Sequence, residues 1–264
     1  MKRAISLFFA LIVLNSCCSV KKSDKKLSTS TTWHWQLQGE INKNYSVKLY
    51  DIDLFDTPKE TIKELQKSGK IVICYFSAGT YEDWREDASS FPKEALGKKM
   101  DGWNERWLDI RDKKVLEIMK ARLDLAKEKN CDGVEPDNVD GYSNDTGFNL
   151  SPKEQLSYNK FLAKEAKNRG LLIGLKNDLA QIKELEPYFD FALNEQCHEY
   201  NECELLTPFI KANKPVFNAE YAQKYVDNIN GARDKLCKDA KKRDIRALIL
   251  PRELDDSFRI SCDD

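Results

Sequence analysis

The sequence predicts a single (β/α)₈ barrel, and three observations support this prediction. Eight segments that resemble strands alternate with helical segments over most of the 264-residue chain. About 220 residues carry this alternation, a length typical of such barrels. No G-x-G-x-x-G motif is present, which disfavours the alternative of a doubly wound, nucleotide-binding sheet.

The expected strands are short and mostly apolar. Residues 71–76 are continuously apolar, as in a strand that is buried on both faces. Residues 57–60 and 151–154 each read Ser/Thr-Pro-Lys-Glu, the pattern of a helix start with Pro at the first helical position. The two helices are expected to end at Gly69 and Gly170. The eight strands are placed at 47–54, 71–76, 107–110, 133–135, 171–175, 189–193, 215–218 and 247–250.

Composition and charge exclude several classes of protein. The chain is 41% hydrophobic, which is enough to form a core and excludes a disordered chain. Its 43 basic and 44 acidic residues give a net charge of -1, so no basic excess points to nucleic acid. A mean hydropathy of -0.63 excludes a protein with several membrane spans.

The N-terminus has the features of an export signal. A basic start precedes the apolar residues 5–14, which are too few to span a bilayer but suit a signal peptide. Leu14-Asn15-Ser16-Cys17 resembles the lipobox of bacterial lipoproteins, which implies lipidation of Cys17; an ordinary signal peptide is the alternative. We expect a lipoprotein signal peptide at 1–17, a disordered tether at 18–32 and the barrel domain at 33–264. The protein would then be a cell-envelope lipoprotein, attached to the membrane only through its lipid.

Export gives the cysteines a structural meaning. Six cysteines remain after the lipobox, and an even number in an oxidising compartment favours disulfides. Cys197 and Cys203 share a polar loop, and Cys237 and Cys262 flank the last strand. Both pairs are therefore predicted to be bridged.

Cys74 and Cys131 lie in or beside apolar strands, and we expect them to be small buried hydrophobic residues. A zinc site is not expected, because no Cys pair has C-x-x-C spacing and the chain has only His34 and His198. No metal or other cofactor is predicted.

Acidic residues follow at least five of the expected strands, where barrels form their active sites. Any one of them could be a solvated loop acid, but converging like charges cost free energy unless they serve a ligand. Two carboxylates across a pocket are the minimum machinery of glycoside hydrolysis. Aromatic side chains that could pack against sugar rings are Trp33, Trp35, Tyr50, Tyr75, Trp103, Trp107 and Tyr221.

Two other hydrolase chemistries have less support. A metal-dependent hydrolase would need a His-rich mouth, although an all-oxygen cation site stays open. Serine catalysis would need a His partner, and Ser77 lacks a surrounding G-x-S-x-G motif.

Several motifs at these strand ends resemble glycoside hydrolase family 114. They are WHWQL at 33–37, YDID at 50–53, CYFSAG at 74–79, DGVEPDNVDGY at 132–142, GLKN at 174–177 and NEQC at 194–197. The resemblance covers about residues 33–262 and implies a (β/α)₈ barrel with endo-α-1,4-polygalactosaminidase activity. One departure is Glu135, where the family pattern leads us to expect Asp.

The resemblance also implies roles for individual residues. Asp137 and Glu195 would be the catalytic carboxylates. The candidate sugar contacts are Asp53, Tyr75, Glu135, Asn138, Asn177 and Glu220. A galactosamine polymer carries free, cationic amines, and a pocket rich in carboxylates suits such a polysaccharide. We expect a monomer; the alternative function is a non-catalytic carbohydrate-binding lipoprotein on the same barrel.

Overall fold

The computed structural model describes residues 26–263. The predicted signal peptide and Cys17 therefore lie outside the described residues. Part of the segment expected to be a tether contacts the domain: Thr31 is buried, and Arg246 Nε donates a 2.6 Å hydrogen bond to the Thr29 carbonyl. Within residues 26–263, no helix has the length and apolar character needed to cross a bilayer.

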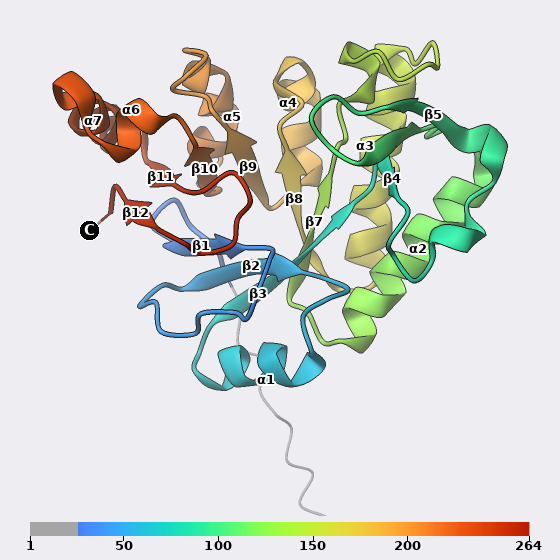
Figure 1. Ribbon diagram of the computed structural model, residues 1–264, viewed down its shortest axis with the longest axis horizontal. Helices are drawn as coiled ribbons and strands as arrows, with labels where there is room; N and C mark the ends of the chain where they lie inside the picture. The colour runs from blue at the N-terminus through green and yellow to red at the C-terminus, as the bar shows by residue number, and fades with distance from the viewer. Residues whose placement is uncertain (1–25, 264) are drawn as a thin grey trace, which may run out of the picture.

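Eight parallel strands form a curled sheet (Figure 1). Each pairs with the next in the order β1 to β3 and β7 to β11, and β12 (Ile260–Ser261) adds an antiparallel edge to β11. The last segment connects back to β1, because Arg259 donates a 3.0 Å hydrogen bond to the Trp33 carbonyl. The fold is the predicted barrel. Its strands are β1 (Trp33–Gln36), β2 (Leu49–Asp53), β3 (Ile71–Ser77), β7 (Gly133–Asp137), β8 (Leu172–Lys176), β9 (Phe191–Glu195), β10 (Val216–Glu220) and β11 (Ile245–Ile249).

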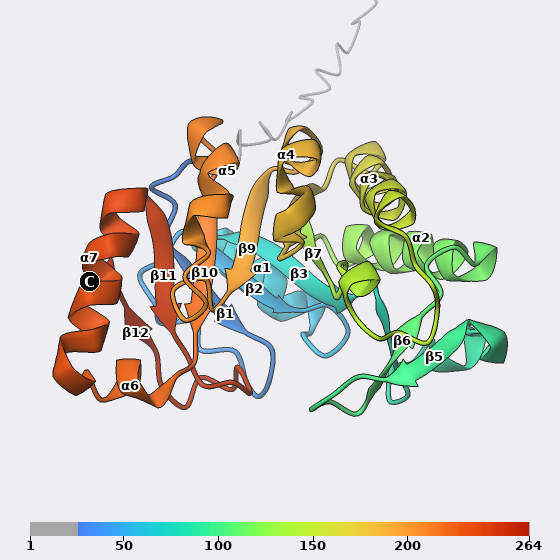
Figure 2. The same cartoon turned by 90° about the horizontal axis from the view of Figure 1, so that it is seen from above.

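Helices cover the outside of this sheet (Figures 1 and 2). The Ser151 and Glu154 capping box is present at the start of α3, as predicted. At α1 the expected Thr57 cap is wrong: Pro58 holds the N-cap position and no side chain caps the helix. The helices are α1 (Lys59–Lys67), α2 (Lys113–Glu128), α3 (Pro152–Asn168), α4 (Ile182–Leu185), α5 (Thr207–Lys211), α6 (Gln223–Val226) and α7 (Ala232–Arg243).

One expected barrel strand belongs elsewhere. Residues 107–108 lie in β6 (Glu105–Leu108), which pairs antiparallel with β4 (Thr80–Glu82) and β5 (Leu96–Lys99) in a separate small sheet. This sheet is an insertion between β3 and α2 (Figure 2). The eighth barrel strand is instead β1, which the sequence analysis did not count. Its four residues include two polar ones, so no apolar run marks it, yet all four are buried.

Strand alternation divides the core into two layers. Trp33, Leu49, Ile73 and Phe217 belong to a cluster inside the barrel, whereas the intervening strand residues pack against the helices. Because side chains alternate strictly, the residues at the ends of the inward-facing rows also point inward. This places Asp53, Tyr75, Asp137, Lys176 and Glu195 at the mouth of the barrel.

Three disulfides join the six cysteines. The predicted bridges Cys197–Cys203 and Cys237–Cys262 are present. The expectation for Cys74 and Cys131 is wrong, because these residues form a third bridge. Strands β3 and β7 are neighbours in the sheet, with Cys74 opposite Val134. The two cysteines are thus brought together although 57 residues separate them in sequence.

Candidate active site

A cavity of about 1240 Å³ opens where the parallel strands end at their carboxyl side. This is the end at which barrel enzymes hold their active sites. Of the aromatic residues singled out in the sequence, Trp33, Tyr50 and Trp107 are buried in the core. The others line the cavity, together with the inward-facing polar residues: Trp35, Asp53, Tyr75, Trp103, Asp137, Asn138, Lys176, Glu195 and Tyr221.

Lys176 is the centre of the cavity floor. Its Nζ lies 2.9 Å from Asp137 Oδ1 and 3.2 Å from Glu195 Oε2. It also lies 3.3 Å from Glu135 Oε1 and 4.9 Å from the centre of the Trp35 ring. Because the Lys176 nitrogen contacts both carboxylates, Asp137 Oδ1 and Glu195 Oε2 can be no further apart than the sum of their distances to that nitrogen.

Two tyrosines hold the other oxygens of the same carboxylates. The Tyr75 hydroxyl donates to Asp137 Oδ2 at 3.2 Å, and the Tyr221 hydroxyl donates to Glu195 Oε1. Burial, reinforced by the adjacent carboxylate, raises the pKa of both tyrosines well above the usual value. The hydroxyls therefore stay protonated and keep donating.

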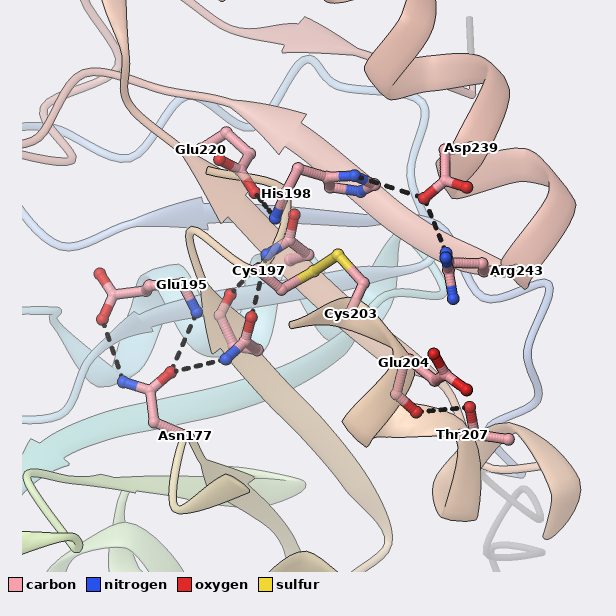
Figure 3. Close-up of a disulfide and its surroundings, with 12 residues drawn as sticks. Asn177, Glu195, Cys197, His198, Cys203, Glu204, Thr207, Glu220, Asp239 and Arg243 are labelled. Carbon is pink, nitrogen blue, oxygen red and sulfur yellow. Dashed lines mark hydrogen bonds and ion pairs between the residues drawn. A yellow bond between two sulfur atoms is a disulfide. The ribbon is translucent and has the colours of Figure 1, made fainter. Parts of the chain in front are cut away.

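Two asparagines fix the backbone and orientation of the pair. The Asn138 backbone N–H donates to Asp137 Oδ1 at 2.7 Å, and its side-chain amide reaches Ser77 and Thr80. Asn177 Oδ1 accepts a 3.0 Å bond from the Glu195 backbone N–H. Asn138 lines the cavity, whereas Asn177 supports Glu195 from the side (Figure 3).

Asn138 has a left-handed φ of 60°, which Asn tolerates better than most residues. A Cβ at Gly79 would lie 1.6 Å from the Asn138 carbonyl oxygen. Glycine is therefore required at position 79 for this turn to approach the end of β3.

Two further carboxyl groups lie in the barrel interior. Glu135 and Asp51 are fully buried, and their carboxyl oxygens have no hydrogen-bond partner among the described residues. Burial raises the pKa of each well above its usual value, and the charge of Lys176 only partly opposes this. Glu135 does not line the cavity; it contacts the site through Lys176.

The remaining candidates lie further from the pair. Asp53 lines the cavity but is engaged with Arg85, at 2.6 Å. Glu220 lies outside the cavity, where its carboxylate accepts a 2.8 Å bond from the His198 backbone N–H. It thereby holds the loop of the Cys197–Cys203 bridge, next to Glu195 in the chain (Figure 3).

His198 and the two bridged cysteines lie close enough together to hold a metal ion. Both sulfur atoms are in the disulfide, so neither offers a thiolate ligand. This group therefore does not fit a metal.

Sequence reasoning missed the central cation. Lys176 ends β8 directly after an apolar run, and it is 2% exposed by side chain. A lysine that an apolar strand carries into the barrel interior is rare enough to be a signal. Tyr221 was recognised only as a possible sugar platform, whereas here it is a hydrogen-bond donor to Glu195.

A barrel whose mouth presents two tethered carboxylates in an open cavity has the architecture of a glycoside hydrolase. The sequence model of glycoside-hydrolase family GH114 matches residues 15–264. The chain belongs to this family and is a glycoside hydrolase. No curated protein sequence matches it.

Solved structures agree with this assignment. The crystal structure of Aspergillus fumigatus Ega3 in complex with galactosamine is similar, with a TM-score of 0.84 and 37% identity. The match covers 90% of this chain and 97% of that one. The glycoside hydrolase domain of PelA from Pseudomonas aeruginosa has a TM-score of 0.68 at 12% identity, over 87% of this chain and 98% of that one. This second likeness concerns the fold alone.

Proposed function

We propose that this enzyme hydrolyses α-1,4-linked galactosamine polymers with Asp137 as the nucleophile and Glu195 as the general acid and base. The observation that carries the proposal is the Asp137–Lys176–Glu195 arrangement, in which one lysine contacts both carboxylates. The similarity to Ega3, whose structure contains galactosamine, supports the substrate class.

The hydrogen bonds favour this division of roles. Asp137 accepts hydrogen bonds from the Asn138 backbone, Lys176 and Tyr75, and these three donors fix its orientation. A nucleophile must be ionised and fixed. Glu195 is more exposed, 29% against 16% by side chain, and so is better placed to exchange protons with a leaving oxygen and with water.

The short carboxylate separation favours retention of anomeric configuration. The two oxygens on Lys176 cannot be as far apart as the ~6.5 Å that begins the inverting range, whereas retaining pairs lie at about 5–5.5 Å. Glu195 would protonate the glycosidic oxygen while an Asp137 oxygen bonds to C1 and the C1–O bond breaks. Glu195 would then take a proton from water as that water displaces Asp137.

The test is release of reducing ends from α-1,4-linked polygalactosamine, with proton NMR of the first-formed anomer. We expect wild-type turnover and an α product. Glu195→Gln should be inactive. Glu204→Gln is the matched control, because it makes the same change at an exposed position of the following loop. Failure of the wild type to cleave the polymer would overturn the substrate assignment, and a first-formed β product would overturn retention.

Export to the cell envelope, with lipidation of Cys17, is part of the same proposal. Three disulfides favour an oxidising compartment. In a bacterial host, Cys17→Ala should release the protein from membranes or block its processing. An unchanged membrane fraction would contradict lipidation.

A further inference from the structure

One buried carboxylate that lines the cavity forms no ion pair with any described residue. Glu105, at the start of β6, lines the cavity and is 8% exposed. No Lys, Arg or His of the described residues forms an ion pair with it. The other buried or half-buried acids that line the cavity do have such partners: Asp137 and Glu195 contact Lys176, and Asp53 and Glu82 contact Arg85.

Glu105 is also held in place on one side only. The Thr80 hydroxyl donates to Glu105 Oε2, and Thr80 in turn accepts a 3.0 Å bond from the Asn138 side chain. Oε1 accepts no hydrogen bond from any described residue. A buried carboxylate in an open cavity, with one oxygen fixed and the other free, lacks a donor that a ligand could supply.

From this geometry we infer that Glu105 binds a substrate ammonium group and selects free amino sugars over N-acetylated ones. The inference rests on the proposed function and names a specificity residue for it. An ammonium at Glu105 would form a charge-assisted hydrogen bond, whereas an N-acetyl group can offer only a neutral amide.

The position of Glu105 fits a sugar next to the reacting bond. Asn138 connects the two sites, because its backbone donates to Asp137 and its side chain donates to Thr80. Trp84 and Trp103, 52% and 40% exposed, line the same cavity and could pack against a sugar ring held there. This side of the cavity, which we call the wall, therefore offers both apolar surface and a negative charge to a bound sugar.

The charges around Glu105 make its binding dependent on pH. Burial, together with the negative charges of Glu82 and Asp137, raises the pKa of its carboxyl to about 7, although the Thr80 hydrogen bond and the charge of Arg85 oppose this rise. Below this pH the empty carboxyl is protonated and neutral. A bound ammonium would be lost as the pH falls, because it no longer faces a charge.

The experiment compares two inhibitors of polygalactosamine hydrolysis, galactosamine and N-acetylgalactosamine. Wild type should bind galactosamine more tightly, and Glu105→Gln should weaken that binding by about 10- to 100-fold. Binding of N-acetylgalactosamine should change less than about threefold. The variant keeps the acceptor for Thr80, so it should fold; Asp101→Asn, an exposed acid in the preceding turn, is the charge-matched control.

Lower pH should weaken galactosamine binding to the wild type and leave Glu105→Gln nearly unaffected. Equal losses for both sugars, or no loss for either, would overturn the inference while the wild type still cleaves its polymer. A fall in kcat with unchanged inhibition would overturn it too, since Glu105 would then act on the reaction itself. A wild type that cleaves no galactosamine polymer would overturn the proposed function, and this inference with it.

Discussion

The floor and the wall of the cavity handle buried charge in opposite ways. In the floor, the single cation Lys176 serves four carboxyl groups: Asp51, Glu135, Asp137 and Glu195. In the wall, the two guanidinium groups of Arg85 and Arg122 match two buried acids, Asp53 and Glu82, and Arg85 contacts both of them, at 2.6 and 2.8 Å. The same guanidinium groups also contact the more exposed Asp56 and Asp87. Matched charges fix a structure, whereas an excess of acid has to be relieved by protonation or by a ligand. The floor is therefore the reactive region and the wall its rigid support, apart from Glu105.

The largest effect should come from Asp137 and Glu195, the two partly exposed acids of the floor. Asp137→Asn and Glu195→Gln should each lower kcat by at least about 100-fold, the usual scale for a lost nucleophile or general acid. The double variant should lose little more than the worse single variant, because the two groups act as a unit. Turnover is measured on polygalactosamine, with circular dichroism to confirm folding. A folded Glu195→Gln variant with near-normal turnover would refute the assignment.

Removing the cation of each region separates their roles. Lys176→Met should lower turnover by about 10- to 100-fold, since both catalytic carboxylates lose a shared donor. Arg85→Met should change turnover less than about tenfold. It should still lower the free energy of unfolding by about 3–5 kcal/mol, because it leaves Asp53 and Glu82 buried without their main cation.

The test measures turnover and the free energy of unfolding in urea for both Lys176→Met and Arg85→Met. If Arg85→Met lost as much turnover as Lys176→Met, the claim that the wall only supports the reactive floor would be contradicted.

The residues of the floor also show which features of the site could be predicted from the sequence and which could not. The acids at the strand ends could be located in advance, because alternation and strand order place them at one mouth. The position of Lys176 at the end of an apolar strand was a signal, but its role could not be predicted, because that role depends on three carboxylates from two other strands converging on one nitrogen. The Cys74–Cys131 bridge and the short strand β1 escaped prediction for a related reason. The bridge depends on which strands are neighbours, and β1 has two polar residues among its four, so only its place in the sheet shows that it is a barrel strand.

The disulfides extend the comparison to stability. The Cys74–Cys131 disulfide joins residues that are 57 positions apart in the sequence. The Cys197–Cys203 disulfide joins residues only six positions apart, in the loop that follows Glu195. Loop entropy predicts that replacing each pair by Ala costs about 4 and about 2 kcal/mol respectively. Loss of the shorter bridge should nevertheless reduce turnover more, because it frees the loop that follows Glu195. Urea midpoints and turnover of the two double variants test this, and the reverse order of turnover would contradict it.

The smallest effect concerns Asp178 and Asp140, two acids that form no ion pair with any of the described residues. Burial, with the charge of Asp140, raises the pKa of Asp178 to about 8; burial, with the charge of Asp137, raises that of Asp140 to about 6. A carboxyl whose pKa is higher in the folded state binds more protons there than in the unfolded chain. The free energy of unfolding must then fall as pH rises from about 4 to 8.

Asp178→Asn removes the larger of these two shifts and suits the left-handed φ of 43° at this position. It should therefore flatten the pH dependence by about 1 kcal/mol or more between pH 5 and 8. Asp244→Asn is the matched control, because Asp244 is exposed and also has a left-handed φ, 59°. Urea unfolding at the two pH values gives the answer. An Asp178→Asn slope equal to that of wild type would mean that these buried acids, unlike those of the floor, do not limit stability at neutral pH.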